Sequence, residues 1–313
     1  MKAPVLSDYK RQGGRCFSLL LKAVTASFSC CIIKAGGKSM YKHRVEIRDG
    51  EAIIVGHLYI PDEKSDRPCI VISHEFGVDQ NWETKYAIEL ARRSYPVFTY
   101  DFPGSGNGCS TGRDTREMSI LTEVGDLMAV VRYLRRRLGD KDLVLCGFSM
   151  GGMVSALAAA EMSDDIAGLI LVYPALSASD DARKGKALGA RFDPHDPPEE
   201  FSTKKPPVTL GRKFIDDAFA VEDWLDLIGA YKGPVLLMHG ENDRVVPIIY
   251  SEMAASVYEN VRFERIPHAG HIFWQPWVKN KAIQKMIVFL AELSLRRQSR
   301  DRARYSKNIK TPD

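Results

Sequence analysis

One junction in the sequence constrains the fold more than any other feature: a serine flanked by glycines between a predicted strand and a predicted helix. The run 143–146 is short and wholly apolar, as in a strand buried on both faces, and the Ala-rich segment 150–161 favours a helix. Between them stands GFSMGG, residues 147–152, which matches the pattern G-x-S-x-G. Here the glycines allow close backbone approach, and the helix dipole points at the serine hydroxyl. The junction predicts a nucleophilic Ser149; the alternative is a glycine turn that only packs a helix on a strand.

Strand-like and helix-like segments alternate along most of the chain. A hairpin around Asp49-Gly50 and six apolar runs give the predicted strands, which are 43–48, 52–60, 69–73, 97–100, 143–146, 169–173, 235–238 and 261–266. Helical patterns occupy 81–93, 117–138, 150–161 and 279–294. This alternation predicts the α/β class, with a mostly parallel, eight-stranded sheet flanked by helices.

A long interval without strand-like sequence interrupts the alternation. It is dense in proline and charge, as in FDPHDPPEEFSTKKPP, and it separates two predicted strands of one sheet. We therefore expect an inserted cap at 175–232 between two parts of the core, 40–174 and 233–295. Residues 1–39 are predicted to be a weakly ordered extension, and 296–313 a basic tail.

The positive charge of the chain is concentrated at its ends. Residues 1–44 and 296–313 hold 16 of the 44 Lys and Arg residues but only three of the 40 acidic ones. Solvated tails explain this pattern; attachment to nucleic acid or acidic lipid is the alternative. We expect no nucleic-acid partner.

The apolar stretch 16–33 is interrupted by Lys22 and by Ser and Thr, which predicts no stable membrane insertion despite a weak likeness to a signal segment.

The cysteines and histidines indicate neither a metal site nor a disulfide framework. The six cysteines contain no C-x-x-C pair, and the seven histidines form no clear ligand cluster. Free thiols fit a reducing compartment, so we expect a cytoplasmic protein without metal or other cofactor.

A nucleophilic serine requires a general base held by an acid, which follow the serine in the order acid, then histidine, in this kind of site. Asp243 stands in VLLMHGENDRVVP, directly after a predicted strand, and His271 stands in HAGHIF, after the last one. We expect His271 to exchange the Ser149 proton and Asp243 to orient the imidazole. Glu241 and His268 are the rival acid and base.

Acyl transfer also needs donors for the developing oxyanion. The backbone N–H of Met150, next to the nucleophile, is one candidate. The N–H of Phe76, in the loop SHEFG after strand 69–73, is the other. Glu75 is unexpected in this loop, because its carboxylate has to point away from the oxyanion or be paired. A structural role, in which Glu75 holds a neighbouring loop, is the alternative.

Five motifs together resemble the α/β-hydrolase superfamily: SHEFG, YDFPGSGNGCSTGRDTREMSILTEVGDL, LVLCGFSMGG, LMHGENDRVVP and HAGHIF. Within it, residues 40–295 are similar to bacterial cinnamoyl (feruloyl) esterases. The resemblance implies a serine carboxylesterase that forms an acyl-enzyme on hydroxycinnamate or other small aromatic esters. Its partner would be a small-molecule ester, no cofactor is implied, and a homodimer is left open.

The resemblance also assigns substrate-binding positions in the cap. In these esterases an acidic residue soon after the sixth strand helps to bind the phenolic ring, and Asp181 matches it; a solvated charge in the run Ser179-Asp180-Asp181 is the alternative. Two other polar positions of the family are changed to Leu188 and Phe214. The change leaves the esterase chemistry intact and puts hydroxycinnamate recognition in question.

Other functions share the same constellation. A serine peptidase, a thioesterase, an acyltransferase and a lactonase all use such a triad. The segment HEFGVD also resembles dienelactone hydrolases, which carry a cysteine where this chain has Ser149. A non-catalytic binding protein on the same scaffold is a further alternative.

Overall fold

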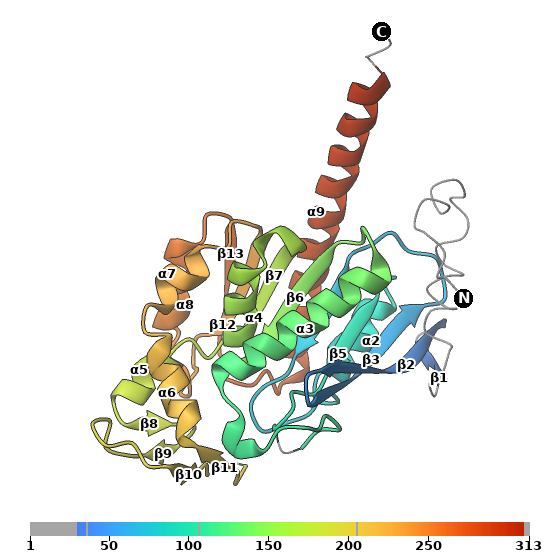
Figure 1. The fold of residues 1–313 in the computed structure, drawn as a ribbon. Helices are drawn as coiled ribbons and strands as arrows, with labels where there is room; N and C mark the ends of the chain where they lie inside the picture. The colour runs from blue at the N-terminus through green and yellow to red at the C-terminus, as the bar shows by residue number, and fades with distance from the viewer. Residues whose placement is uncertain (1–29, 36, 106, 205, 310–313) are drawn as a thin grey trace.

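The computed structural model describes residues 30–309 except 36, 106 and 205 (Figure 1). Its centre is one nine-stranded sheet with the order β1-β2-β3-β5-β4-β6-β7-β12-β13. The strands are β1 (Cys30–Ala35), β2 (Lys38–Asp49), β3 (Ala52–Pro61), β4 (Cys69–Ser73), β5 (Val97–Tyr100), β6 (Leu143–Phe148), β7 (Ile166–Val172), β12 (Val235–Gly240) and β13 (Val261–Ile266). The first three strands pair antiparallel, and the six from β5 to β13 pair parallel. The predicted α/β-hydrolase class, a mostly parallel sheet flanked by helices, is confirmed.

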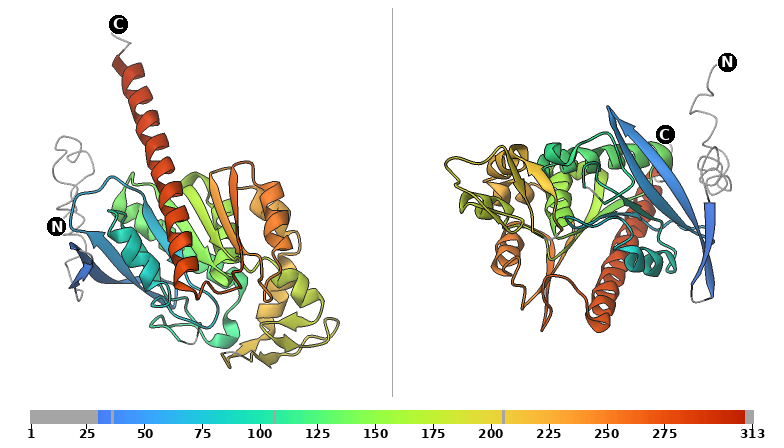
Figure 2. Two further views of the ribbon diagram at one scale, coloured as in Figure 1. Left: turned by 180° about the vertical axis from the view of Figure 1, so that it is seen from behind. Right: turned by 90° about the horizontal axis from the view of Figure 1, so that it is seen from below.

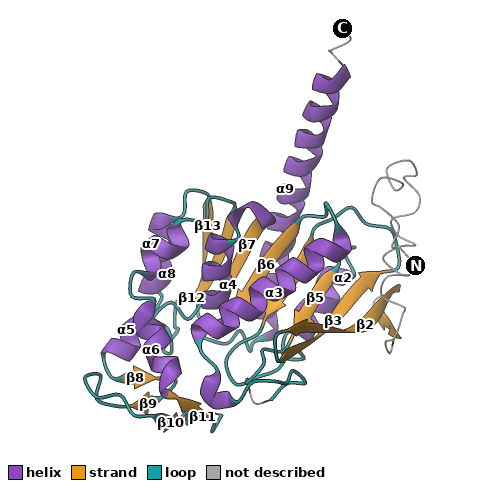
Figure 3. Ribbon diagram, in the orientation of Figure 1, coloured by secondary structure: helices purple, strands orange, loops and turns teal. Residues whose placement is uncertain are grey.

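Helices cover both faces of the sheet, and this explains why its central strands are apolar throughout (Figures 2 and 3). The helices of the core are α2 (Thr84–Ala91), α3 (Ile120–Leu138), α4 (Met150–Glu161), α8 (Ile249–Val257) and α9 (Pro276–Ile309). Alternate residues of β6 enter two different cores: Leu143 and Leu145 pack with α3 and α4, whereas Val144 and Cys146 pack with α2 and α9. Burial on both faces removes the polar alternation of a half-exposed strand.

The N-terminal boundary and the strand count differ from the sequence-based expectation. Residues 30–35 form a ninth strand, where eight strands were expected, and β2 begins at Lys38, so part of the expected extension 1–39 belongs to the sheet. Gly37, with a φ of 78°, provides the left-handed residue that the connecting turn requires. The remainder of the expected extension, 1–29, lies outside the described residues.

The C-terminal end differs as well. The predicted closing helix 279–294 begins earlier, at Pro276, and continues to Ile309, so most of the expected tail 296–313 is helical. Its buried side chains end at Leu293, and beyond this point the helix extends away from the sheet (Figure 1). No Gly or Pro interrupts it, and the Arg, Leu and Ala residues there have high helix propensity. Residues 310–313 lie outside the described part.

The segment between β7 and β12 contributes no described strand to the main sheet. It contains helices and two small antiparallel sheets at one end of the molecule (Figure 1): α5 (Ala178–Arg183), β8 (Lys186–Ala187), β9 (Ala190–Arg191), β10 (Glu200–Ser202), β11 (Thr209–Gly211), α6 (Arg212–Ala220) and α7 (Trp224–Gly229). Polar contacts join this cap to the core around the short 3-10 helix η2 (Thr115–Glu117), where the Thr115 hydroxyl donates to the Thr209 carbonyl at 2.7 Å.

Candidate active site

Ser149 lies at the sharp turn between β6 and α4, in a backbone conformation rare for a residue other than glycine. Its φ is 47° and its ψ is −113°. The turn requires Gly151, because a Cβ there would lie 2.4 Å from the carbonyl oxygens of Ser73 and His74. Such local strain is typical of functional sites, and the turn places the serine hydroxyl beyond the end of the sheet.

The structure brings Ser149, His271 and Asp243 into one hydrogen-bonded chain, although they are separated by 122 and 28 positions in sequence. Ser149 Oγ lies 2.8 Å from His271 Nε2, and His271 Nδ1 lies 2.8 Å from Asp243 Oδ2. Each side chain comes from the carboxyl end of a parallel strand, β6, β13 or β12, and such ends share one edge of the sheet. With Nδ1 donating to the carboxylate, Nε2 can accept the serine proton.

Hydrogen bonds keep the buried Asp243 carboxylate ionised. Its Oδ1 accepts the backbone N–H groups of Val245 and Val246 at 2.8 and 2.9 Å. Burial by itself raises the pKa of Asp243, but the hydrogen bonds from His239, His271 and the Val246 N–H outweigh burial and lower the pKa below its usual range. The group therefore remains an acceptor at neutral pH.

His239 is a member of the site that the sequence analysis missed. It lies buried in β12, with Nε2 3.0 Å from Asp243 Oδ2 and 3.0 Å from the Val246 carbonyl oxygen. Its Nδ1 lies 2.7 Å from Ser251 Oγ. Because a carbonyl only accepts, Nε2 carries a proton and donates. The sequence signal was a histidine inside an otherwise apolar strand, four positions before the acid.

The two predicted oxyanion donors are both free to donate. In the described part of the chain, neither the Phe76 nor the Met150 backbone N–H donates to a backbone or side-chain acceptor. Met150 is the first residue of α4, where helical N–H groups have no partner within the helix.

His74 fixes the peptide that carries the Phe76 N–H. The imidazole is buried, its Nδ1 lies 2.7 Å from the Glu75 carbonyl oxygen, and its Nε2 accepts the Phe102 N–H at 3.2 Å. Burial lowers the pKa of His74, so the ring is neutral, with the proton on Nδ1. In a trans peptide the C=O and the following N–H point in opposite directions. Holding the Glu75 carbonyl therefore aims the Phe76 N–H the other way.

The carboxylate of Glu75 is paired. Tyr173 Oη donates to Glu75 Oε1 at 2.7 Å, and both side chains are buried. The same tyrosine ring packs against His271, with centroids 5.1 Å apart. Burial raises the pKa of Glu75, and the Tyr173 hydrogen bond opposes this effect. Glu75 thus joins the loop that carries Phe76 to the tyrosine ring that packs against His271.

The rival residues lie elsewhere. Glu241 and His268 are both exposed. Within the described residues, neither side chain makes a hydrogen bond or ion pair with Ser149, His271 or Asp243.

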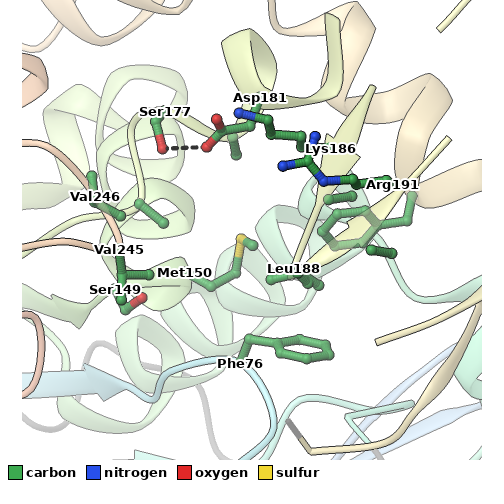
Figure 4. A pocket seen from close by; sticks show the side chains of 16 residues that line it. Phe76, Ser149, Met150, Ser177, Asp181, Lys186, Leu188, Arg191, Val245 and Val246 are labelled. Atoms are coloured by element: carbon green, nitrogen blue, oxygen red, sulfur yellow. Dashed lines mark hydrogen bonds between the residues drawn. The ribbon is translucent and has the colours of Figure 1, made fainter. Parts of the chain in front are cut away.

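A pocket of about 410 Å³ opens above Ser149, between the core and the cap (Figure 4). Its wall near the nucleophile is mostly apolar. The three predicted substrate-binding residues Asp181, Leu188 and Phe214 all line it. Asp181 is held by the Ser177 hydroxyl, which donates to its Oδ2 at 2.7 Å. Phe214, in α6, is 3% exposed, and its ring packs edge-on against Phe201.

No group of three or more His, Cys, Asp or Glu side chains within the described residues is arranged to hold a metal ion. No helix among them combines the length and the hydropathy that crossing a bilayer requires.

Several protein families and known proteins are similar to parts of this chain. A family described as serine aminopeptidase, S33, matches residues 64–195, and one described as alpha/beta hydrolase fold matches residues 198–274. A putative esterase/lipase of Mycoplasma pneumoniae is 28% identical over 229 residues, covering 66% of this chain and 82% of that protein. The monoglyceride lipase of Rattus norvegicus is 32% identical over 127 residues, 40% of this chain and 41% of the lipase.

A solved structure extends the similarity to the whole fold. Est1E from Butyrivibrio proteoclasticus, with ferulic acid bound, superposes with a TM-score of 0.73 at 24% identity, over 79% of this chain and 99% of Est1E. At this identity the superposition establishes the fold alone. Together with the strand–serine–helix turn and the chain order of the three hydrogen-bonded residues, these similarities show an α/β-hydrolase fold, and the two relatives that the chain resembles are a putative esterase/lipase and a lipase.

Proposed function

We propose that the protein is a serine carboxylesterase that works through an acyl-enzyme. The observation that carries this proposal is the continuous chain Asp243–His271–Ser149, which ends at a pocket beside two free backbone donors. A nucleophile, its base, the group that orients the base and the oxyanion donors are the parts that acyl transfer requires.

In the proposed reaction each of these groups takes part in a defined step. Ser149 Oγ attacks the ester carbonyl carbon while His271 Nε2 takes the hydroxyl proton, and the carbonyl oxygen becomes an anion that accepts the N–H groups of Phe76 and Met150. Collapse breaks the ester bond, and His271 returns the proton to the departing alcohol. Water then attacks the acyl-enzyme with His271 again as base, which releases the acid and restores Ser149. Asp243 stays ionised and stabilises the imidazolium in both halves.

The pocket supports a small or aromatic acyl group. Its volume of about 410 Å³ and its apolar residues Phe76, Leu188 and Phe214 suit a single ring or a short chain. The ferulic acid bound in Est1E supports a hydroxycinnamate, with Asp181 as the acceptor for a phenolic hydroxyl. Leu188 and Phe214 offer no polar group to such a ring, so a less polar aromatic ester suits the pocket as well.

The test compares wild type with Ser149→Ala on methyl ferulate, p-nitrophenyl butyrate and an aminoacyl anilide. We expect wild type to hydrolyse the esters and the variant to lose activity by about a thousandfold or more. Ferulate turnover supports the aromatic substrate class, and turnover of the butyrate alone supports an esterase for other acids. Unchanged activity in Ser149→Ala contradicts the proposal.

A peptidase is the second candidate, because one matching family is described as serine aminopeptidase. Cleavage of the anilide in preference to both esters would favour it. Labelling by a serine-directed phosphonate, abolished in Ser149→Ala, separates either enzyme from a binding protein on this scaffold.

The proposal extends to location and assembly. The described cysteines Cys31, Cys69, Cys109 and Cys146 are free thiols, which supports a reducing compartment such as the cytoplasm. A homodimer stays a proposal, which sedimentation of the purified protein tests directly.

A further inference from the structure

One hairpin of the cap supplies a continuous stretch of the pocket wall. All six residues 186–191, from Lys186 through Arg191, line the pocket. The turn of this β8–β9 hairpin is Leu188-Gly189, with φ of 48° and 84°. A leucine is rarely found at positive φ, where Asn, Asp or Gly is usual. The hairpin keeps this unfavourable residue at a position that faces the pocket, which is typical of a functional constraint.

The two ends of the hairpin carry like charges directly opposite each other. Lys186 is the cross-strand partner of Arg191 in the β8–β9 register. Like charges at directly opposed positions destabilise a strand pair. In the part of the chain that the structure describes, neither side chain has a hydrogen bond or ion pair with a carboxylate. The opposed like charges therefore destabilise the same hairpin as the positive φ of Leu188. Both features lie on residues that line the pocket.

The two cations share one end of the pocket with the carboxylate that the esterase resemblance assigns to substrate. Figure 4 shows Lys186, Arg191 and Asp181 at one end and Ser149 at the other, with Leu188 and Met150 between them. One oxygen of Asp181 accepts the Ser177 hydroxyl. The two cations outnumber this single carboxylate, so an anionic group at this end meets a net positive charge.

We propose that this end of the pocket binds a carboxylate of the substrate, remote from the scissile ester. The preferred substrate is then a half-ester of a dicarboxylic acid, whose apolar middle lies along Leu188 and Phe214 while Lys186 and Arg191 bind the free acid. This inference rests on the proposed esterase function. The guanidinium of Arg191 suits a carboxylate because its N–H groups match the two oxygens, and bound anion offsets the repulsion across the hairpin.

The test uses two esters on the full chain that differ only in the substituent at the far end of the ring: the monomethyl ester of 4-carboxycinnamic acid at its acrylate end, and methyl 4-methylcinnamate. The measured quantity is the ratio of kcat/KM for the carboxylate ester to that for the neutral ester. We expect Lys186→Gln with Arg191→Gln to lower this ratio by about tenfold or more, through KM of the carboxylate ester. Added salt should lower the wild-type ratio as well, because these cations are exposed.

Lys184→Gln with Lys204→Gln is the matched control, since both are cap lysines outside the pocket lining. Its ratio should equal that of wild type. A ratio that stays the same in the double variant of Lys186 and Arg191, or that falls equally in the control, overturns the inference.

Binding separates this inference from the proposed function. Titration of Ser149→Ala with 4-carboxycinnamate dianion, followed by calorimetry, needs no turnover. We expect about tenfold weaker binding after the Lys186 and Arg191 substitutions, and no such loss for 4-methylcinnamate. Wild type that hydrolyses no ester, together with selective dianion binding, refutes the esterase and keeps the anion site. Hydrolysis of the neutral ester without anion selectivity refutes the anion site and keeps the esterase.

Discussion

The core and the cap build the same pocket by different means. In the core Ser149, Asp243 and His271 follow six-residue strands of the main sheet, and the Asp243 side chain is 0% exposed while that of His271 is 11% exposed. In the cap the pocket is lined by a hairpin of two-residue strands, on which Lys186 and Arg191 are exposed. The proposed catalytic residues follow strands of the rigid sheet, and the residues proposed to bind substrate lie on an insertion that can vary without disturbing the sheet.

The largest effect that follows from this contrast concerns Asp243. Asp243→Asn keeps the shape of the side chain but removes the charge that stabilises the imidazolium. We expect kcat to fall by about 10³ to 10⁴ on every ester, measured by steady-state kinetics. Glu241→Gln, two positions away and exposed, is the control and should match wild type. A loss below tenfold in Asp243→Asn would mean that the acid does not act through His271.

Phe214→Ala tests the contribution of the cap to stability and to substrate binding. Removing this buried ring should cost about 3 kcal/mol of unfolding free energy, measured in urea, because it leaves a cavity beside Phe201. KM for aromatic esters should rise while kcat for p-nitrophenyl acetate changes little, since the triad lies on the sheet. A kcat that falls equally for both esters would remove the distinction between the two regions.

Substitution of His239 tests whether a core residue behind the triad contributes to catalysis. His239→Asn removes the donor that lies 3.0 Å from Asp243 Oδ2, so the carboxylate loses one partner. We expect about a tenfold decrease in kcat, with KM unchanged, because only the orientation of the acid is affected. Ser251→Ala, which frees His239 Nδ1 but keeps Nε2, should show a smaller decrease. A KM that rises while kcat falls would point to a general packing defect.

The smallest predicted effect is the pH dependence that His74 gives to stability. Burial lowers its pKa below the ordinary 6.5, so below this pH the unfolded chain binds a proton that the folded chain does not. Stability is then full above about pH 6.5 and declines as the pH falls toward the lowered pKa, by about 1 kcal/mol per pH unit. Urea unfolding of wild type and His74→Gln at about pH 7.5 and about pH 5.5 should show a smaller decline in the variant. Identical declines would assign the effect to other groups.

The parts of the site that local sequence predicts are those built from a strand and the residues right after it. The apolar runs and the turn residues after them predict the sharp turn at Ser149 and the candidates Asp243 and His271. Their choice over Glu241 and His268 follows from the fold, because only contacts between distant strands decide which side chain meets the serine. His239 was missed because its only local signal is a single histidine in an otherwise apolar strand, which by itself assigns no role. The strand 30–35 was missed because a single short edge strand resembles the apolar stretch before it.

The sequence by itself determined the alternation of strands and helices, and with it a mostly parallel sheet with Ser149 at the turn after one of its strands. Burial on both faces makes the central strands short, wholly apolar runs, and the turn at Ser149 needs glycine at fixed positions around it. Only the tertiary structure decided what the pocket presents to a substrate. Leu188 and Phe214 are 26 positions apart, and Lys186 opposes Arg191 across a hairpin of two-residue strands. Such short elements carry almost no periodicity, so their position depends on packing against the core rather than on their own sequence.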